Sequence, residues 1–303
     1  MSKLPNITTS IFSVMSQLAN QHGAINLSQG FPNFPEDERL LQISERIIRK
    51  NIHQYTPMAG LPSLLEKIAN QTLKQYDRKV NTATEMLITA GATQGVFTTI
   101  NTFLNHGDEV LILDPSYDSY EPSVLVAGGK PVRVSLNLDY TPNFNKIEAA
   151  ITPKTKAIIA VHLYGHPCDM DALVEICKKN DLFLIEDCAE AIGTMYKGKH
   201  VGTFGDISTF SFFGNKTITT GEGGMVVTND ATLHDRSVHF KGQGLAKHRQ
   251  YWHDVIGYNY RMTNICAAIG LAQLENIEQV LIEKKRVADT YRKCLENTSI
   301  VFH

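Results

Sequence analysis

One lysine, Lys216, stands at the centre of the stretch with the greatest chemical potential, which runs from Asp206 to Thr228. An apolar run from Ile207 to Phe213 precedes the lysine and predicts a strand, and a turn rich in Thr and Gly follows it. The pattern therefore places Lys216 on a loop at a strand end. A partly desolvated amine there can form a Schiff base with a carbonyl carbon. A solvated surface lysine fits the same local pattern, so Lys216 alone does not decide between the two interpretations.

Acidic residues follow a second predicted strand. The sequence DLFLIEDCAEA, residues 181–191, is an apolar run that ends in Glu186 and Asp187, with Glu190 three positions later. The carboxyl ends of parallel strands are where such sheets bind ligands. We therefore expect the carboxyl end of this strand to open into a site.

Three segments of the C-terminal half carry a resemblance to a known family. They read ITPKTKAIIAVHLYGHPCDM, LIEDCAEAIGTMYKGKHVGTFGDISTFSFFGNKTITTGEGGMVVTND and YWHDVIGYNYRMTNICAAIGLAQLE. From about residue 150 to 303 the chain resembles the DegT/DnrJ/EryC1/StrS sugar aminotransferases, which depend on pyridoxal 5'-phosphate and have fold type I. The resemblance is strongest to members that aminate a nucleotide-linked 4-keto-6-deoxy sugar with glutamate, as perosamine synthases do.

This resemblance implies a role for five residues. Lys216 would hold the cofactor as a Schiff base and move a proton between cofactor and substrate carbons. Asp187 would pair with the protonated pyridine nitrogen, and Glu190 would lie near the ring hydroxyl. Ser211 would donate to the cofactor phosphate, which Asn259 would reach from the partner subunit. Family members with His in place of this lysine are dehydratases, so Lys216 favours amino transfer.

The N-terminal part carries a different resemblance. From Ile7 to about Gly129 the chain is similar to class I/II aminotransferases of the methionine and kynurenine type, in INLSQGFPNFP, HQYTPMAGLPSLLEKIA and ITAGATQGVFTTINTFLNHGDEVLILDPSYDSYEP. This similarity implies that Gly30 faces the substrate carboxylate. It also implies that Tyr55 contacts the phosphate bound by the neighbouring subunit.

The turn AGATQG and the tyrosine that follows the next strand are further candidates for cofactor contacts. By resemblance, Ala92 and Thr93 would offer backbone N–H groups to the phosphate, and Thr93 also its hydroxyl. The physical reason is that a helix N-terminus presents unpaired N–H groups and a favourable dipole to an anion. Tyr117 would stack on the pyridine ring, a position that both families fill with an aromatic residue. A tyrosine packed at a strand end is the alternative.

The two resemblances meet between about residues 126 and 155, which predicts a chimeric chain. We divide it into an N-terminal helix and following loop (1–35), a cofactor-binding large domain (36–275) and a long helix (276–303). In both families a smaller C-terminal domain follows this helix, whereas the chain ends at His303. We therefore expect an incomplete substrate side.

Composition excludes several classes of protein. The 303 residues are 43% hydrophobic and 20% charged, with a net charge of -2, as in ordinary globular proteins rather than nucleic-acid or anionic-membrane binders. The five cysteines have no zinc or redox spacing, and the histidines are scattered, so we predict no metal site. Because the N-terminus has no apolar signal core, the cytoplasm is the expected compartment.

Alternation of strand and helix patterns predicts a three-layer α/β/α fold with a mostly parallel sheet, the large domain of fold type I. We also expect a homodimer, since the contacts implied for Tyr55 and Asn259 cross between subunits. The predicted strands are Met86–Thr89, Glu109–Leu113, Pro131–Val134, Ala157–Val161, Phe183–Glu186, Ile207–Phe212 and Met225–Val227.

Three functions remain open at this stage. The first is transfer of an amino group from glutamate to a nucleotide-linked keto sugar. The second is an amino-acid aminotransferase of class I, acting on methionine or kynurenine and a 2-oxo acid. The third is a domain that binds pyridoxal phosphate without efficient turnover.

Overall fold

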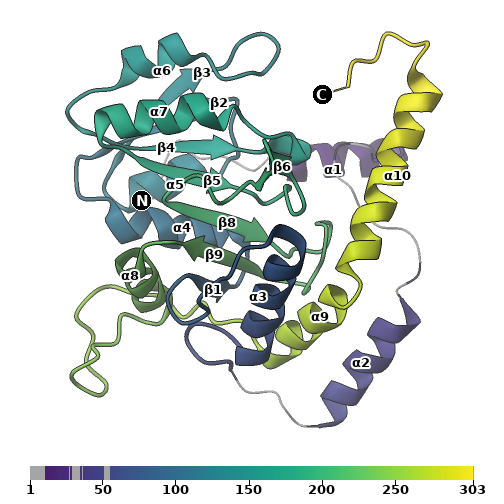
Figure 1. The fold of residues 1–303 in the computed structure, drawn as a ribbon, viewed down its shortest axis with the longest axis horizontal. Helices are drawn as coiled ribbons and strands as arrows, with labels where there is room; N and C mark the ends of the chain where they lie inside the picture. The colour runs from purple at the N-terminus through teal and green to yellow at the C-terminus, as the bar shows by residue number, and fades with distance from the viewer. Residues whose placement is uncertain (1–10, 27, 29–34, 36, 51–54, 303) are drawn as a thin grey trace.

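The computed structural model describes residues 11–26, 28, 35, 37–50 and 55–302, which fold around a seven-stranded sheet. The strand order is β1-β9-β8-β5-β4-β2-β3, and Figure 1 shows these strands from β3 at the top to β1 at the bottom. Their bounds are β1 (Met86–Thr89), β2 (Glu109–Asp114), β3 (Lys130–Ser135), β4 (Thr155–Val161), β5 (Phe183–Asp187), β8 (Ile207–Ser211) and β9 (Gly224–Thr228). Each predicted strand is therefore present, β1 with the predicted ends and the others with ends that differ by at most two residues.

The sheet is mostly parallel, as expected. β8, β5, β4, β2 and β3 pair in parallel, whereas β9 is antiparallel to both of its neighbours, β1 and β8. The chain reverses between β8 and β9, which pair directly as a hairpin through the loop over residues 212–223. Lys216 lies in this loop.

Helices cover both faces of the sheet and confirm three layers. On one face, α4 (Ala92–Phe103), α5 (Tyr120–Val126) and α8 (Ala231–Lys241) pack against the strands. On the other lie α3 (Pro62–Tyr76), α6 (Phe144–Ala150), α7 (Met170–Asn180) and α9 (Asn264–Leu274). Alternate residues of a strand point to opposite faces of the sheet, and both faces of β1 are apolar: Leu87 packs on the first face, and Met86 and Ile88 pack on the second.

Local sequence explains where these elements begin and end. β2 and β4 are almost continuous apolar runs, EVLILD and TKAIIAV, because both of their faces are covered. Asp169 caps α7 by accepting a hydrogen bond from the N–H of Ala172, and Asp181 ends the helix with a left-handed backbone at φ 54°. A one-turn 3-10 helix (Leu163–Gly165) and a small hairpin of β6 (Met195–Tyr196) and β7 (Lys199–His200) complete this half.

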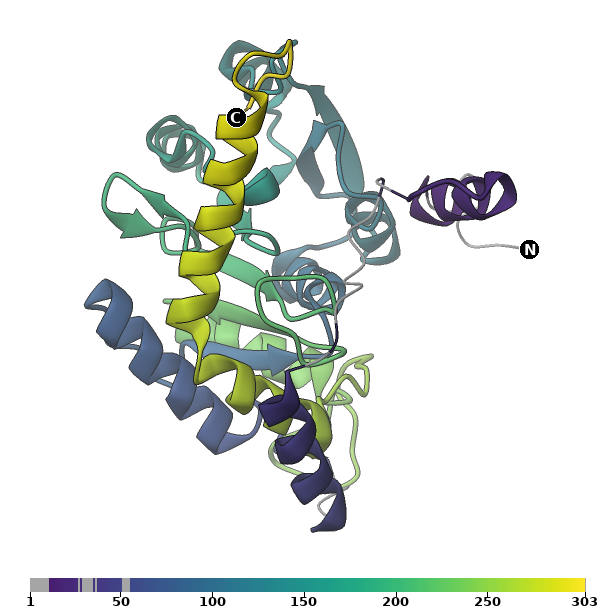
Figure 2. The ribbon, with the colours of Figure 1, turned by 90° about the vertical axis from the view of Figure 1, so that its right-hand side faces the viewer.

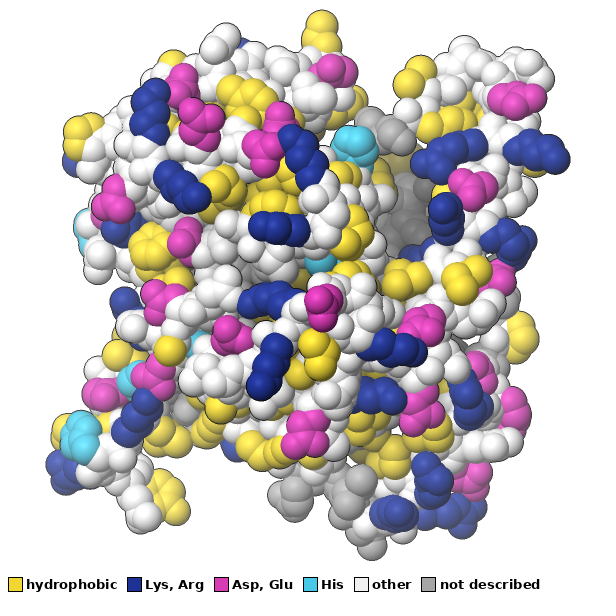
Figure 3. Space-filling model, in the orientation of Figure 1, with side chains coloured by type: hydrophobic (Ala, Val, Ile, Leu, Met, Phe, Trp, Pro, Cys, Tyr) yellow, Lys and Arg dark blue, Asp and Glu magenta, His cyan; other side chains and the backbone are white. Residues whose placement is uncertain are grey.

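Three further helices lie outside the two covering layers. The long helix α10 (Ile277–Leu295) runs along the side of the molecule towards which β4 and β8 point (Figure 1), and Figure 2 looks straight onto it. Figure 3 shows basic side chains gathered over α10. α2 (Glu38–Arg49) packs against α9, while the predicted N-terminal helix, α1 (Ile11–His22), stands apart and has no buried residue.

Among the described residues, no single helix combines the length and the apolar composition of a membrane span. The helices α9 and α10 meet both conditions only as a pair, and they are bent by 68° relative to each other.

Candidate active site

The predicted site residues collect at the carboxyl ends of the central strands. Asp187 is the last residue of β5, and Ser211 is the last residue of the neighbouring β8. Glu190 follows three residues after β5, and Lys216 follows five residues after β8. Parallel pairing of the two strands is what brings these four residues to the same edge of the sheet.

Lys216 and Glu190 form an ion pair at this edge. The Nζ atom of Lys216 lies 2.9 Å from Oε1 of Glu190, and the two side chains are 21% and 32% exposed. The other carboxylate oxygen of Glu190 accepts a hydrogen bond of 2.9 Å from the backbone N–H of Tyr164. Glu190 is thus oriented at both oxygens, and one of them points at the amine on which the predicted chemistry depends.

Asp187 is buried beneath this pair. Its Oδ2 accepts a hydrogen bond of 2.6 Å from the hydroxyl of Tyr120, and its Oδ1 accepts one of 2.9 Å from the N–H of Ala189. Burial raises the pKa of Asp187 above its ordinary value, although the hydrogen bonds and the positive charge of Lys216 oppose this rise. Both hydrogen-bond donors are neutral, so a cationic N–H group in contact with the carboxylate would relieve the cost of its burial.

Tyr120 is a site residue that sequence reasoning missed. Its ring is fully buried, and it packs edge-on against Tyr117 with 5.7 Å between the ring centroids. A signal was available, because tyrosines three positions apart at the start of a helical turn lie on the same side of the turn. Tyr117 itself is 41% exposed, and its hydroxyl lies 3.2 Å from Oγ1 of Thr93.

The predicted anion-binding turn lies where α4 begins. Ala92 and Thr93 are the first two residues of this helix, so their N–H groups have no partner within the helix. Gly91 precedes them at φ 121°, a backbone conformation that only glycine adopts readily. A Cβ atom built on Gly224 would lie 2.6 Å from the carbonyl carbon of Gly91 and 2.7 Å from the nitrogen of Ala92. Close backbone contact with β9 therefore fixes the turn.

Ser211 belongs to the same surroundings, because it pairs with Gly224 across β8 and β9. The Ser211 side chain is 4% exposed, and its hydroxyl oxygen accepts a hydrogen bond of 3.3 Å from the N–H of Phe213. The hydroxyl hydrogen remains available to an acceptor, as the predicted phosphate contact requires.

Tyr55 and Asn259 come together at a second place, through a residue that was not predicted. The guanidinium carbon of Arg261 lies 4.6 Å from the ring centroid of Tyr55, and Nε of Arg261 donates to Oδ1 of Asn259 over 3.4 Å. Tyr55 is 56% exposed. No described contact links this group to Lys216 within one subunit. Gly30, the predicted substrate-binding residue, lies outside the described residues.

His162, Glu186 and Cys188 form a buried group whose potential ligand atoms lie within 4.8 Å of one another. The Glu186 carboxylate, however, accepts hydrogen bonds from the N–H groups of Gly202, Phe204 and Gly205 and contacts Nε2 of His162 at 3.1 Å. Nδ1 of His162 accepts a hydrogen bond from the N–H of Cys168. Nε2 of His162 therefore carries the ring hydrogen and donates it in the hydrogen bond to Glu186. These contacts indicate a structural network that holds the loop over residues 202–205.

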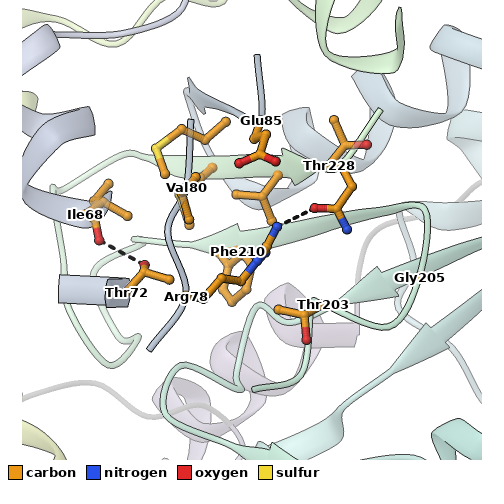
Figure 4. A pocket seen from close by; sticks show the side chains of 14 residues that line it. Ile68, Thr72, Arg78, Val80, Glu85, Thr203, Gly205, Phe210 and Thr228 are labelled. Atoms are coloured by element: carbon orange, nitrogen blue, oxygen red, sulfur yellow. Dashed lines mark hydrogen bonds between the residues drawn. The ribbon is translucent and has the colours of Figure 1, made fainter. Parts of the chain in front are cut away.

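A small pocket of about 60 Å³ lies elsewhere, between α3, β1, β9 and the same loop (Figure 4). Arg78 donates a hydrogen bond to Asn229 across it, and apolar side chains such as Phe210 and Val80 line much of the remainder. None of the residues around Lys216 lines this pocket.

Most of the chain is similar to a known protein family. Residues 70–303 match the DegT/DnrJ/EryC1/StrS aminotransferase family. The match begins at residue 70 and not at about residue 150, so it overlaps the part assigned to class I/II aminotransferases. The chimeric origin of the chain therefore stays a prediction.

Individual proteins are also similar to the chain. GDP-perosamine synthase of Escherichia coli O157:H7 is 58% identical over 228 residues, which are 75% of this chain and 60% of that enzyme. The solved structure of PseC, an aminotransferase from Helicobacter pylori, has a TM-score of 0.75 and 26% identity over 88% of this chain and 70% of that one. YbdL of Escherichia coli, with a methionine aminotransferase function, has a TM-score of 0.76 and 28% identity over 97% of this chain and 76% of that one.

The chain spans only 51–60% of the length of the GDP-perosamine synthases that it matches. Within that span the matched region includes Lys216, Asp187, Glu190 and Ser211, together with the strands that position them. The chain belongs to the DegT/DnrJ/EryC1/StrS aminotransferase family.

Proposed function

We propose that the chain is an aminotransferase that binds pyridoxal 5'-phosphate at the strand ends and transfers an amino group to a nucleotide-linked keto sugar. The observation that carries the proposal is that a buried carboxylate, Asp187, lies at the same edge of the sheet as an amine, Lys216, which Glu190 orients at 2.9 Å. In fold type I enzymes a carboxylate of this kind pairs with the ring nitrogen of the cofactor, and the lysine forms a Schiff base with its aldehyde.

The residues present fit the cofactor at each of its polar ends. The buried Asp187 carboxylate has only neutral hydrogen-bond donors among the described residues, so a protonated ring nitrogen is a suitable partner. The start of α4 and the hydroxyl of Ser211 offer N–H and O–H donors to the phosphate. The half-exposed ring of Tyr117 lies between these ends and supplies an aromatic surface for stacking.

When bound, pyridoxal phosphate supplies an electron sink for the carbon that carries the transferred amine. The protein's own groups then control protons and orientation. Asp187 keeps a proton on the ring nitrogen, and Tyr120 holds the carboxylate in place for this purpose. Lys216 moves a proton through Nζ, and Glu190 orients that amine through its Oε1.

The acceptor is proposed from the 58% identity to GDP-perosamine synthase. We infer a GDP-linked 4-keto-6-deoxy sugar as acceptor and glutamate as amino donor. The subunit arrangement is inferred from the phosphate contacts that the resemblance implies for Tyr55 and Asn259. These two residues are exposed, Arg261 is half-buried, and no described contact connects the three residues with Lys216. A homodimer in which this group reaches the partner's phosphate accounts for its place on the surface. The cytoplasm remains the expected compartment.

Two other functions stay in view. An amino-acid aminotransferase is favoured by the similarity to YbdL, which extends over 97% of the chain. A domain that binds the cofactor without efficient turnover is the third possibility, because most of the family match lies in the cofactor-binding part.

The test is an absorbance titration of the purified protein with pyridoxal phosphate, followed by separate additions of glutamate and methionine. We expect a visible band that glutamate removes, after which amination of a GDP-linked keto sugar is measured directly. Loss of the band with methionine alone supports the amino-acid aminotransferase, and a band that neither donor changes supports the third function. Lys216→Ala should lack the band, whereas Lys199→Ala, which removes an exposed lysine, should keep it.

A further inference from the structure

The last residue of α8, Lys241, is a buried cation outside the cluster around Lys216. Its side chain is 0% exposed, and its ammonium group donates a hydrogen bond to the carbonyl oxygen of Met58. No carboxylate of the described residues forms an ion pair with it. Burying a charge in this way costs free energy, so packing alone does not explain a lysine at this position.

Lys241 joins the two segments that carry the exposed group of Tyr55, Asn259 and Arg261. Its side chain bonds residues 55–60 through the carbonyl oxygen of Met58, and its own carbonyl oxygen accepts from the N–H of Tyr260 at 3.1 Å. A further bond between the segments runs from Oγ1 of Thr56 to the carbonyl oxygen of Met262, at 2.9 Å. Lys241 is therefore the only side chain described that bonds residues 55–60 from α8.

The exposed group is positively charged and has no acidic partner. Arg261 contacts the ring of Tyr55 and the amide of Asn259, and neither Arg261 nor Lys241 forms an ion pair with a carboxylate of the described chain. A guanidinium that has no carboxylate partner among the described residues favours binding of an anion.

We infer that Lys241 is a positioning residue, whose buried side-chain amine fixes residues 55–60 against 258–262 so that Tyr55, Asn259 and Arg261 receive a phosphate monoester held by a second copy of the chain. The inference rests on the proposed function, because the phosphate is that of the cofactor. Lys241 acts through the exposed group and does not touch the phosphate itself.

The test compares two aldehydes that differ only in the phosphate, pyridoxal phosphate and pyridoxal. Their dissociation constants are measured by absorbance for the wild-type protein, Lys241→Met and the control Lys247→Met. Lys247 is an exposed lysine paired with Asp235, so the control removes one positive charge of the same region. We expect Lys241→Met to weaken binding of pyridoxal phosphate about tenfold or more, equivalent to about 1.4 kcal/mol, and to leave pyridoxal unchanged.

An equal loss for both aldehydes would show that Lys241 merely supports the fold, and no loss for either would also overturn the inference. Lys241→Gln, which keeps a hydrogen-bond donor, serves as a second variant if Lys241→Met does not fold. It should restore part of the preference for the phosphorylated aldehyde. Light scattering measures whether the protein is a dimer. If the protein is a monomer and Lys241→Met still weakens binding of pyridoxal phosphate alone, the phosphate is not held by a second copy of the chain.

Failure of the proposed function has a different signature. If the wild-type protein forms a visible band with neither aldehyde, Lys216 does not hold the cofactor. Inorganic phosphate then tests Lys241 by itself: phosphate should raise the melting temperature of the wild-type protein and of Lys247→Met, but not that of Lys241→Met. Absence of this stabilisation in the wild-type protein would overturn the inference about Lys241.

Discussion

Tyr120 donates the hydrogen of its hydroxyl to Oδ2 of Asp187, and the two oxygens lie 2.6 Å apart. Burial, together with the negative charge of Asp187, raises the pKa of Tyr120 well above its ordinary value. The hydroxyl therefore remains a donor throughout the pH range in which enzymes are assayed. Tyr120 lowers the cost of an ionised Asp187 and fixes its orientation, which links the start of α5 to the chemistry at the end of β5.

Tyr120→Phe should weaken cofactor binding without altering the fold. A hydrogen bond to a charged group is worth about 1.5–3 kcal/mol, which corresponds to a loss of about 10- to 100-fold in affinity. Absorbance titration with pyridoxal phosphate measures this loss. Tyr140→Phe is the control, because Tyr140 is 62% exposed. Equal affinities of the wild-type protein and Tyr120→Phe would show that the hydroxyl does not support the carboxylate.

Asp187→Asn should stabilise the cofactor-free protein and abolish activity. Because burial raises the pKa of Asp187, the folded protein binds this proton more tightly than the unfolded chain does. The contribution of Asp187 to the free energy of unfolding therefore falls as pH rises from its pKa in the unfolded chain to its higher pKa in the folded protein. Above the higher pKa the contribution stays low. Removing the charge should add about 1 kcal/mol or more at pH 7.

Urea unfolding of the cofactor-free protein between pH 4 and pH 8 measures this difference, with the exposed Asp289→Asn as control. The stability gained by Asp187→Asn should grow as pH rises. A variant less stable than the wild-type protein at pH 7 would mean that the buried Asp187 carboxylate does not destabilise the cofactor-free protein.

Gly224→Ala should damage the turn at the start of α4. The added Cβ would lie within 2.7 Å of backbone atoms of Gly91, Ala92 and Phe210, which cannot rotate away. Overpacking of this kind costs about 1–3 kcal/mol. Gly214→Ala is a matched control in the adjoining loop, because a Cβ there meets nothing within 4 Å. Calorimetry and cofactor titration should find a loss for Gly224→Ala alone.

Lys241 should make stability increase with pH above neutrality. Burial, together with the nearby charge of Arg261, lowers the pKa of Lys241 from 10.5 to about 7. Between these two values the unfolded chain binds more protons than the folded protein, so the free energy of unfolding rises with pH. The slope reaches about 1.4 kcal/mol per pH unit. Comparing urea unfolding of the wild-type protein and Lys241→Met from pH 7 to 9 isolates it, and parallel curves would contradict a buried titrating ammonium.

The sequence was sufficient to predict the sheet and the group of Lys216, Asp187 and Glu190. Each of these residues follows a short apolar run, and parallel pairing of such strands places their carboxyl ends together. The prediction that β8 continues to Phe212 was one residue too long, because the carbonyl oxygen of Phe212 accepts a hydrogen bond from the N–H of Thr220 in the following loop instead of continuing the pairing with β9. Strand ends depend on such local contacts, which the apolar pattern does not reveal.

The contributions of Arg261 and Lys241 were not predictable from the sequence. Lys241 lies in the polar sequence HFKGQG, which indicates an exposed helix end. Its burial comes from residues 183 positions earlier, around Met58, that fold over it. The contact between Arg261 and Tyr55 likewise joins distant segments. Tertiary contacts of this kind leave no periodic signal in either segment.

The central claim is that Lys216 is the amine that holds the cofactor, and peptide mapping after reduction tests it most directly. The protein is incubated with pyridoxal phosphate, reduced with borohydride, digested and analysed by mass spectrometry. We predict that the phosphopyridoxyl mass lies on the peptide that contains Lys216, in a stoichiometry close to one per chain. A stoichiometric adduct on another lysine would contradict the account.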